Sequence, residues 1–207
     1  MVDDPNVDDF IANIPRREIV LRTAQDHSDH GTRVQEFEPA LIQSLRDTSP
    51  ENPVLEIGNR DGGSALWIMW NLYEDAERRK LITVDVNAQP TLIAEWATKL
   101  EIPTEHHKMS QEDFIKGLLY LPNSEITTAR CYAFVYLDAD HGEATVTRDL
   151  RILANYVCKG GIIAVDDVES WKELPVIDGL ERIEFKVDEG NQVSPVHGHH
   201  IAFWVKK

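Results

Sequence analysis

The sequence predicts a single α/β domain built around a mostly parallel β-sheet. Short apolar runs alternate with helical patterns along the chain, and the runs are rich in β-branched residues. Several runs are apolar at every position, which is typical of parallel strands buried on both faces. The length of 207 residues fits one structural domain, in which we expect an N-terminal helical cap at 1–50 and a main unit at 51–207.

The predicted elements follow one another in a regular order. Two helices, at 17–24 and 35–45, precede a stop at 47–50 formed by Asp, Thr, Ser and Pro. Four buried strands are expected at 54–58, 81–86, 131–138 and 161–167. Crossover helices are expected at 64–79, 91–100, 110–121 and 144–157. The runs at 182–187 and 200–205 predict a closing antiparallel hairpin.

Composition and charge narrow the classes of function. The chain carries 21 Lys and Arg against 36 Asp and Glu, a net charge of −15, which disfavours a nucleic-acid partner or an anionic membrane surface. The longest stretch without these residues, Gly190 to Val205, contains three histidines and a proline, so we expect no membrane span. The acidic N-terminus does not resemble a secretory signal, and Cys131 and Cys158 lie in apolar runs. We therefore expect reduced core thiols and a cytoplasmic protein.

Acidic residues follow three of the four central strands. Asp85 follows one strand, Asp138 another, and the adjacent pair Asp166 and Asp167 a third. In an open parallel sheet, ligands bind outside the carboxyl ends of the strands, so these carboxylates should meet at one edge. A single Asp at such a place commonly caps a helix or starts a turn, but four at the same edge favour a ligand site.

A glycine-rich turn, EIGNRDGGS at 56–64, connects the first central strand to a helix. Glycines let the backbone approach a ligand closely, and a helix N-terminus attracts a carboxylate or phosphate. The spacing is neither G-x-G-x-x-G nor that of a phosphate loop. Asp85, at the end of the next strand, is placed to accept both hydroxyls of a ribose. The turn and Asp85 together indicate a cofactor that contains a nucleoside.

The motifs VLEIGNRDGGS, VDV, FVYLDADH and KGGIIAVDDV resemble those of a known enzyme family. They are similar to the class I S-adenosylmethionine-dependent O-methyltransferases of small molecules, in particular the metal-dependent ones that include the catechol and macrolide-sugar enzymes. The resemblance covers roughly 53–168, and the tail hairpin fits the same fold. It implies a Rossmann-like class I methyltransferase fold, with a seven-stranded, mostly parallel sheet and an antiparallel last strand.

The resemblance also implies a set of cofactor-binding residues. Asp85 would hold the ribose, and MSQED at 109–113 is similar to the adenine-binding segment of the catechol-type enzymes. Ser110 has an alternative role as the N-cap of the following helix. The complete set predicted to bind S-adenosyl-L-methionine is Glu56, Gly58, Gly62, Gly63, Ser64, Asp85, Ser110, Gln111 and Asp138.

The family's three metal ligands match Asp138, Asp166 and Asp167, which implies a divalent cation, most simply Mg²⁺. Three crowded carboxylates repel one another unless a cation neutralises them. The alternative is that one of them, or Asp140, only caps a helix or pairs with a cationic side chain. His141 matches the general base of the macrolide-sugar enzymes, whereas the catechol enzymes have lysine there. Asp138 and His141 are therefore the predicted catalytic residues.

Three histidines precede the last strand, His197, His199 and His200, and we expect a solvated hairpin in which one or two of them contact substrate. Trp171 follows the paired aspartates and is more simply a core residue than a substrate contact. The predicted activity is methyl transfer to a hydroxyl of a small-molecule acceptor, with a homo-oligomer left open. The alternatives are a cephalosporin-hydroxylase-like component and a non-catalytic cofactor-binding protein.

Overall fold

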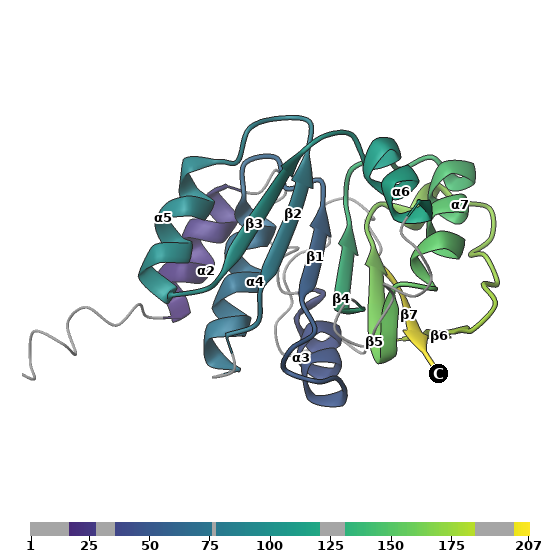
Figure 1. Ribbon diagram of the computed structural model, residues 1–207, viewed down its shortest axis with the longest axis horizontal. Coiled ribbons are helices and arrows are strands. Elements are labelled where there is room, and N and C mark those ends of the chain that lie inside the picture. Colours follow the sequence, from purple (N-terminus) through teal and green to yellow (C-terminus); the bar gives the residue numbers. More distant parts are fainter. Residues whose placement is uncertain (1–16, 28–35, 76–77, 121–130, 185–200) are drawn as a thin grey trace, which may run out of the picture.

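The structure, a computed structural model, describes residues 17–27, 36–75, 78–120, 131–184 and 201–207 (Figure 1). Its strands are β1 Val54–Ile57, β2 Leu81–Asp85, β3 Thr104–Lys108, β4 Tyr132–Leu137, β5 Val157–Val165, β6 Leu180–Ile183 and β7 Ala202–Lys206. Its α-helices are α2 Arg17–Asp26, α3 Glu38–Asp47, α4 Gly63–Glu74, α5 Thr91–Leu100, α6 Gln111–Leu119 and α7 Glu143–Leu153. A short 3₁₀ helix, Val168–Ser170, follows β5.

The strands form one seven-stranded sheet in the order β3-β2-β1-β4-β5-β7-β6. The first five strands of this order are parallel, and β7 pairs antiparallel with both β5 and β6. The order reverses between β1 and β4, and such a reversal in a parallel sheet opens a crevice at the carboxyl ends of the strands. The predicted fold class, with its antiparallel last strand, is confirmed.

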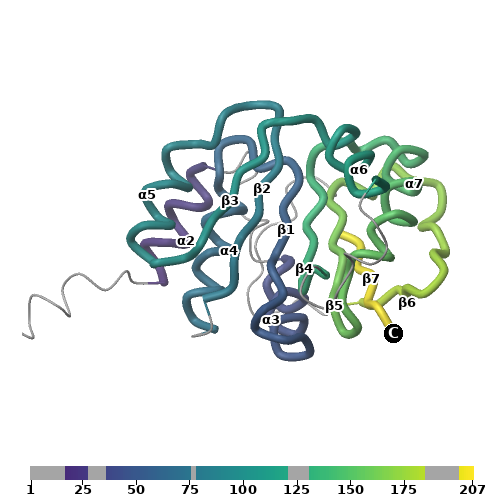
Figure 2. The backbone as a smooth tube through the Cα atoms, viewed as in Figure 1, coloured from purple at the N-terminus to yellow at the C-terminus, as the bar shows by residue number. Residues whose placement is uncertain are grey.

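Two hydrophobic cores cover the two faces of the sheet. One core packs α2, α3, α4 and α5 against one face, and the other packs α6 and α7 against the opposite face (Figures 1 and 2). Alternation along β4 divides its side chains between them, since Phe134 and Tyr136 face the first core and Val135 and Leu137 the second. Trp67, Trp70 and Trp96 lie in the first core, as their helical spacing predicted.

The sequence pattern missed one strand and shortened another. Strand β3 has the sequence TEHHK, which is polar because β3 lies at the edge of the sheet and no position along it is fully buried. A search for continuous apolar runs cannot find such an edge strand. Strand β5 begins at Val157, before the predicted start at 161, because its first residues pair with the beginning of β4.

The expectation of reduced cysteines is wrong, because Cys131 and Cys158 form a disulfide. Cys131 immediately precedes β4 and Cys158 is the second residue of β5, and these neighbouring strands pair through Tyr132 and Val157. Their Cα atoms are therefore 5.0 Å apart, a separation that suits a disulfide, although 27 residues separate them in the sequence. The pairing depends on strand register, which the apolar pattern around each cysteine does not reveal.

Among the helices of the described residues, none combines the length and hydropathy needed to cross a membrane. The cytoplasmic location remains a prediction, without the support that reduced thiols gave it. The three histidines at 197, 199 and 200 lie outside the described residues.

Candidate functional site

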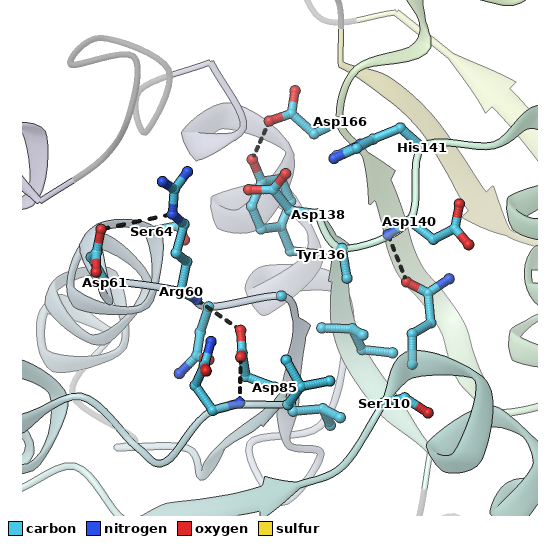
Figure 3. Close-up of a pocket in the computed structure, with 18 of the residues that line it drawn as sticks. Arg60, Asp61, Ser64, Asp85, Ser110, Tyr136, Asp138, Asp140, His141 and Asp166 are labelled. Atoms are coloured by element: carbon cyan, nitrogen blue, oxygen red, sulfur yellow. Dashed lines mark hydrogen bonds and ion pairs between the residues drawn. The ribbon is translucent and has the colours of Figure 1, made fainter.

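A cavity of about 630 Å³ opens at the carboxyl edge of the central strands (Figure 3). It lies where the sheet order reverses, and loops after β1, β2, β4 and β5 contribute to its walls. All of the site residues predicted from the sequence line this cavity except Glu56 and Gly62, which lie just behind its wall in the glycine turn and its strand. The acidic residues at the strand ends thus meet at one edge, as the crevice rule predicted.

The glycine turn approaches the end of β4 very closely. Gly58 has a φ of 91°, and a Cβ atom there would collide with the backbone carbonyl of Asp138. Gly62 has a φ of 88° and is the N-cap of α4, whose first residues Gly63 and Ser64 line the cavity. A Cβ at Gly63 would meet the carbonyl oxygen of Ala24 at 2.5 Å, so the end of α2 closes against the start of α4. Glycine at these positions makes the narrow wall possible.

Asp85 holds the turn in place. Its Oδ2 accepts a hydrogen bond of 2.9 Å from the backbone N–H of Arg60, and its Oδ1 accepts one of 2.8 Å from Asn87 (Figure 3). A carboxylate oxygen has more than one lone pair, so each oxygen can also accept a bond from a ribose hydroxyl. The positioning of the turn by Asp85 is a role that sequence reasoning did not foresee.

Ser110 is the N-cap of α6, as its alternative role predicted. Its hydroxyl accepts the backbone N–H of Asp113 at 3.1 Å. Gln111 bridges two neighbouring segments: its Nε2 donates to the buried carboxylate of Asp149 at 2.7 Å, and its Oε1 accepts the N–H of Asp140 at 3.2 Å. Gln111 therefore supports the loop after β4, and its contact with adenine stays a prediction.

Glu56 is a fully buried acid beside the cavity. Burial raises its pKa to about 8, against a lowering effect of the hydrogen bond that Ser64 donates to Oε1 and a small raising effect of Asp85. Its Oε2 and both polar atoms of the Asn59 side chain are buried without a hydrogen-bond partner among the described residues. Asn59 also lines the cavity. A buried polar atom without a partner is unfavourable, and a polar ligand at Asn59 would supply the missing hydrogen bonds.

The structure brings Asp138, His141 and Asp167 into one group. One ligand atom from each lies within 4.8 Å of the others, and His141 Nδ1 is 3.5 Å from Asp167 Oδ2. Two local features build the group. Asp167 has a φ of 58°, the left-handed region, which Asp tolerates better than most residues, and Trp171 Nε1 donates to the His141 carbonyl at 3.1 Å. Trp171 thus acts through the loop backbone, and it also packs against the second core.

Asp166 lies apart from that group although it was predicted with it. It is 3% exposed, its Oδ2 accepts the hydroxyl hydrogen of Tyr136 at 3.0 Å, and its Oδ1 accepts the N–H of Asp167 at 2.9 Å (Figure 3). Burial and the neighbouring carboxylates raise the pKa of Tyr136 well above its ordinary value, so Tyr136 remains a donor. Sequence reasoning missed Tyr136, although its place two residues before Asp138 on the same strand put it on the same face.

Comparisons with known proteins agree with this architecture. The crystal structure of a protein from Klebsiella pneumoniae, described there as a putative O-methyltransferase, is similar to this chain. The identity is 16%, the TM-score is 0.58, and the match covers 97% of this chain and 96% of that one. The rRNA methyltransferase aviRa from Streptomyces viridochromogenes is similar at 16% identity and a TM-score of 0.53, with 94% of each chain covered. Among curated proteins, none matches this chain.

The sheet order, the glycine turn and the acidic residue at the end of β2 define a Rossmann-like methyltransferase fold. Residues 55–168, more than half of the chain, match the family described as Methyltransferase domain, and the chain belongs to that family. It is an S-adenosylmethionine-dependent methyltransferase.

Proposed function

We propose that this enzyme transfers the methyl group of S-adenosylmethionine to a hydroxyl oxygen of a small molecule, with the assistance of a divalent cation. The observation that carries the proposal is the group Asp138, His141 and Asp167, which shares one cavity with the glycine turn and Asp85. A methyl group leaving the cofactor at the turn would meet an acceptor bound at this group.

The chemistry of the donor atoms fits a divalent cation. Two carboxylates and an imidazole lie within 4.8 Å of one another, and all three are partly exposed to the cavity. Carboxylate oxygens are ligands of Mg²⁺, Ca²⁺ and Mn²⁺, so the carboxylates would hold the cation and the His141 imidazole would lie beside it as a proton acceptor. A bound cation would supply positive charge that lowers the pKa of the acceptor hydroxyl.

The residues of the chain would divide the remaining work. Asp85 would hold the ribose hydroxyls, and the N-terminal amides of α4 with Ser64 would receive the carboxylate of the cofactor's methionine part. Gln111 and Trp171 hold the loop between Asp138 and His141 by their contacts with Asp140 and His141. Such a rigid loop favours the in-line approach that methyl transfer requires. His141 is the sequence-based candidate for the group that accepts the hydroxyl proton.

The net charge of −15 supports a small acceptor over RNA, because a phosphate backbone would be repelled. A cephalosporin-hydroxylase-like component would not form a methylated product from S-adenosylmethionine and an acceptor. A non-catalytic cofactor-binding protein would not need the group formed by Asp138, His141 and Asp167, whereas metal-assisted O-methyl transfer would use it.

The test is product formation by the purified full-length chain. The chain is incubated with methyl-labelled S-adenosylmethionine, Mg²⁺ or Mn²⁺, and a panel of hydroxylated sugars and catechols, and products are identified by mass spectrometry. We expect an O-methylated product that is lost on chelation and in Asp138→Asn. Asp61→Asn is the matched control, because Asp61 lines the same cavity with a largely exposed side chain outside the group. Methylation of RNA but of none of the small acceptors would refute the proposal.

A further inference from the structure

We propose that Asp149 is a positioning residue of the methyl-transfer reaction: it fixes the side-chain amide of Gln111, and Gln111 holds the loop after β4. This loop carries Asp138 and His141. Asp149 itself lies on α7 and is not among the residues that line the cavity. Its effect on the reaction rests on the proposed function, which places the acceptor beside the loop. Its effect on Gln111 is a property of the fold and can be measured without an acceptor.

The loop after β4, residues 138–142, is held at its middle by Gln111. The backbone N–H of Asp140 donates to Oε1 of Gln111 at 3.2 Å, which is the dashed line at Asp140 in Figure 3. The side chain of Asp140 then accepts the N–H of Gly142 at 2.8 Å and closes the turn that leads into α7. His141 lies between these two hydrogen bonds. The contact with Gln111 therefore helps to set where His141 leaves the loop.

The orientation of the Gln111 amide depends on its partners, because the donor end and the acceptor end have nearly the same shape. The partner of its Nε2 is Oδ2 of Asp149, at 2.7 Å. A carboxylate offers only acceptors, so it binds the NH₂ end and leaves the oxygen end for the N–H of Asp140. In the opposite orientation, two acceptors would meet at Asp149 and two donors at Asp140. Asp149 thus selects the orientation that holds the loop.

Burial makes this selection strong. Asp149 is fully buried and Gln111 is 8% exposed, so water cannot replace a hydrogen bond that is lost between them. The other carboxylate oxygen, Oδ1, accepts a bond of 2.8 Å from Nε of Arg148, whose side chain is half-exposed. A buried ion pair by itself adds little stability, since desolvation offsets the attraction. The role of Asp149 therefore follows from its contact with Gln111.

Asp149→Asn tests the selection because it keeps the shape of the side chain and replaces one acceptor by a donor. Its single oxygen should face Arg148, whose charged group forms the stronger hydrogen bond. The new NH₂ group then faces Gln111, which has to turn its oxygen toward Asp149→Asn and its own NH₂ toward Asp140. Two donors meet there, and the loop loses its hydrogen bond.

A second substitution should restore the bond. Gln111→Glu, added to Asp149→Asn, supplies an acceptor at both ends of the side chain at position 111. One oxygen can accept the N–H of Asp140, and the other can accept the NH₂ group introduced at position 149. The double variant also has the same net charge as the wild type. A recovery in the double variant therefore reports the hydrogen-bond pattern, and not the presence of a carboxylate at position 149.

The experiment measures the exchange of amide hydrogens with water by NMR, on the ¹⁵N-labelled full-length chain without an acceptor. The N–H of Asp140 should exchange at least tenfold faster in Asp149→Asn and within threefold of the wild type in the double variant. Two other amides should change less than threefold in both. They are the N–H of Asp113, bonded to the hydroxyl of Ser110, and the N–H of Val146 on α7, and they show that both helices are intact.

Arg148→Ala is the matched control. It removes the partner of the other oxygen of the same carboxylate and leaves the contact with Gln111 in place. The exchange of the Asp140 N–H should therefore stay within threefold of the wild type. A further measurement needs no substitution: one hydrogen of the Gln111 side-chain NH₂ group should exchange slowly, because it is buried against Asp149. The proposal can thus be tested even if a variant does not fold.

Turnover tests the effect on the reaction. With an acceptor found in the panel of sugars and catechols, kcat should fall at least tenfold in Asp149→Asn and recover at least threefold in the double variant. A role limited to stability would lower the melting temperature of Asp149→Asn and leave kcat of the folded enzyme unchanged.

Separate results would overturn each step. Unchanged exchange at Asp140 in Asp149→Asn, or rapid exchange of both side-chain hydrogens of Gln111 in the wild type, would show that Asp149 does not orient the amide. Faster exchange at Asp140 with wild-type kcat would show that the hydrogen bond does not position the reacting groups. If the wild type methylates no acceptor, the proposed function fails, while the exchange rates still decide whether Asp149 fixes Gln111.

Discussion

Replacement of Glu56 by glutamine should change how the stability of the enzyme depends on pH. Burial raises the pKa of Glu56 from 4.5 to about 8, so the folded state binds this proton more tightly than the unfolded state does. The stability associated with the proton is complete below pH 4.5 and is lost as pH rises toward 8. Above that pH both states are ionised, and the loss stops.

The size of the effect follows from the two pKa values. Each pH unit between 4.5 and about 8 costs about 1.4 kcal/mol, so the complete loss is roughly 5 kcal/mol. Roughly 3–4 kcal/mol of it falls between pH 5 and pH 8. Glutamine resembles the protonated acid and does not ionise. The Glu56→Gln variant should therefore gain stability relative to the wild type by about this amount as pH rises from 5 to 8.

The assay is urea unfolding followed by tryptophan fluorescence at several pH values from 5 to 8. Glu112→Gln is the control, because Glu112 is exposed on α6 and its hydrogen bond with Lys116 lowers its pKa. Glu112 is therefore ionised throughout this range, and its variant should run parallel to the wild type. Parallel curves for Glu56→Gln and the wild type would refute the reasoning, since they would mean that Glu56 is already ionised in the folded enzyme.

Three further predictions concern the turn, the ribose and the disulfide. Gly58→Ala should abolish binding of S-adenosylhomocysteine in calorimetry, because its Cβ would strike the backbone after β4. Gly117→Ala is the control: a Cβ there meets nothing within 4 Å, so this variant should stabilise the protein by about 0.5–1 kcal/mol. Full affinity in Gly58→Ala would contradict the close approach. Asp85→Ala should weaken that binding more than tenfold, and unchanged affinity would remove Asp85 from the site. Replacement of both Cys131 and Cys158 by serine should lower the free energy of unfolding by roughly 3–4 kcal/mol, because the disulfide closes a loop of 27 residues in the unfolded chain. Cofactor affinity should not change. An unaltered urea midpoint would argue against the pairing.

The fold could be predicted from the sequence because its strands are buried on both faces. At β1 and β4 every residue is buried, so continuous apolar runs located these strands to within one residue. Glycines and acids then marked the carboxyl ends. The pattern failed where burial is incomplete, as at the edge strand β3, and where the evidence is a contact between distant segments, as in the disulfide between Cys131 and Cys158.

The site could be predicted as a set of residues but not as a geometry. The crevice rule brings Asp85, Asp138, Asp166 and Asp167 to one edge, and they all line one cavity. The rule does not say which side chains are already engaged. Asp85 holds the glycine turn through the backbone amide of Arg60, a contact between residues 25 positions apart that no local pattern encodes.

The paired aspartates show why this limit is physical. Successive side chains of an extended strand point to opposite faces, so two adjacent acids at a strand end cannot both face one ion unless the backbone departs from that alternation. Strand β5 ends at Val165. Asp167 has a φ of 58° and its side chain joins Asp138, while the Asp166 carboxylate accepts the Tyr136 hydroxyl. The sequence pair is compatible with either orientation. The backbone angle at Asp167 decides how the two carboxylates are placed in the cavity that both of them line.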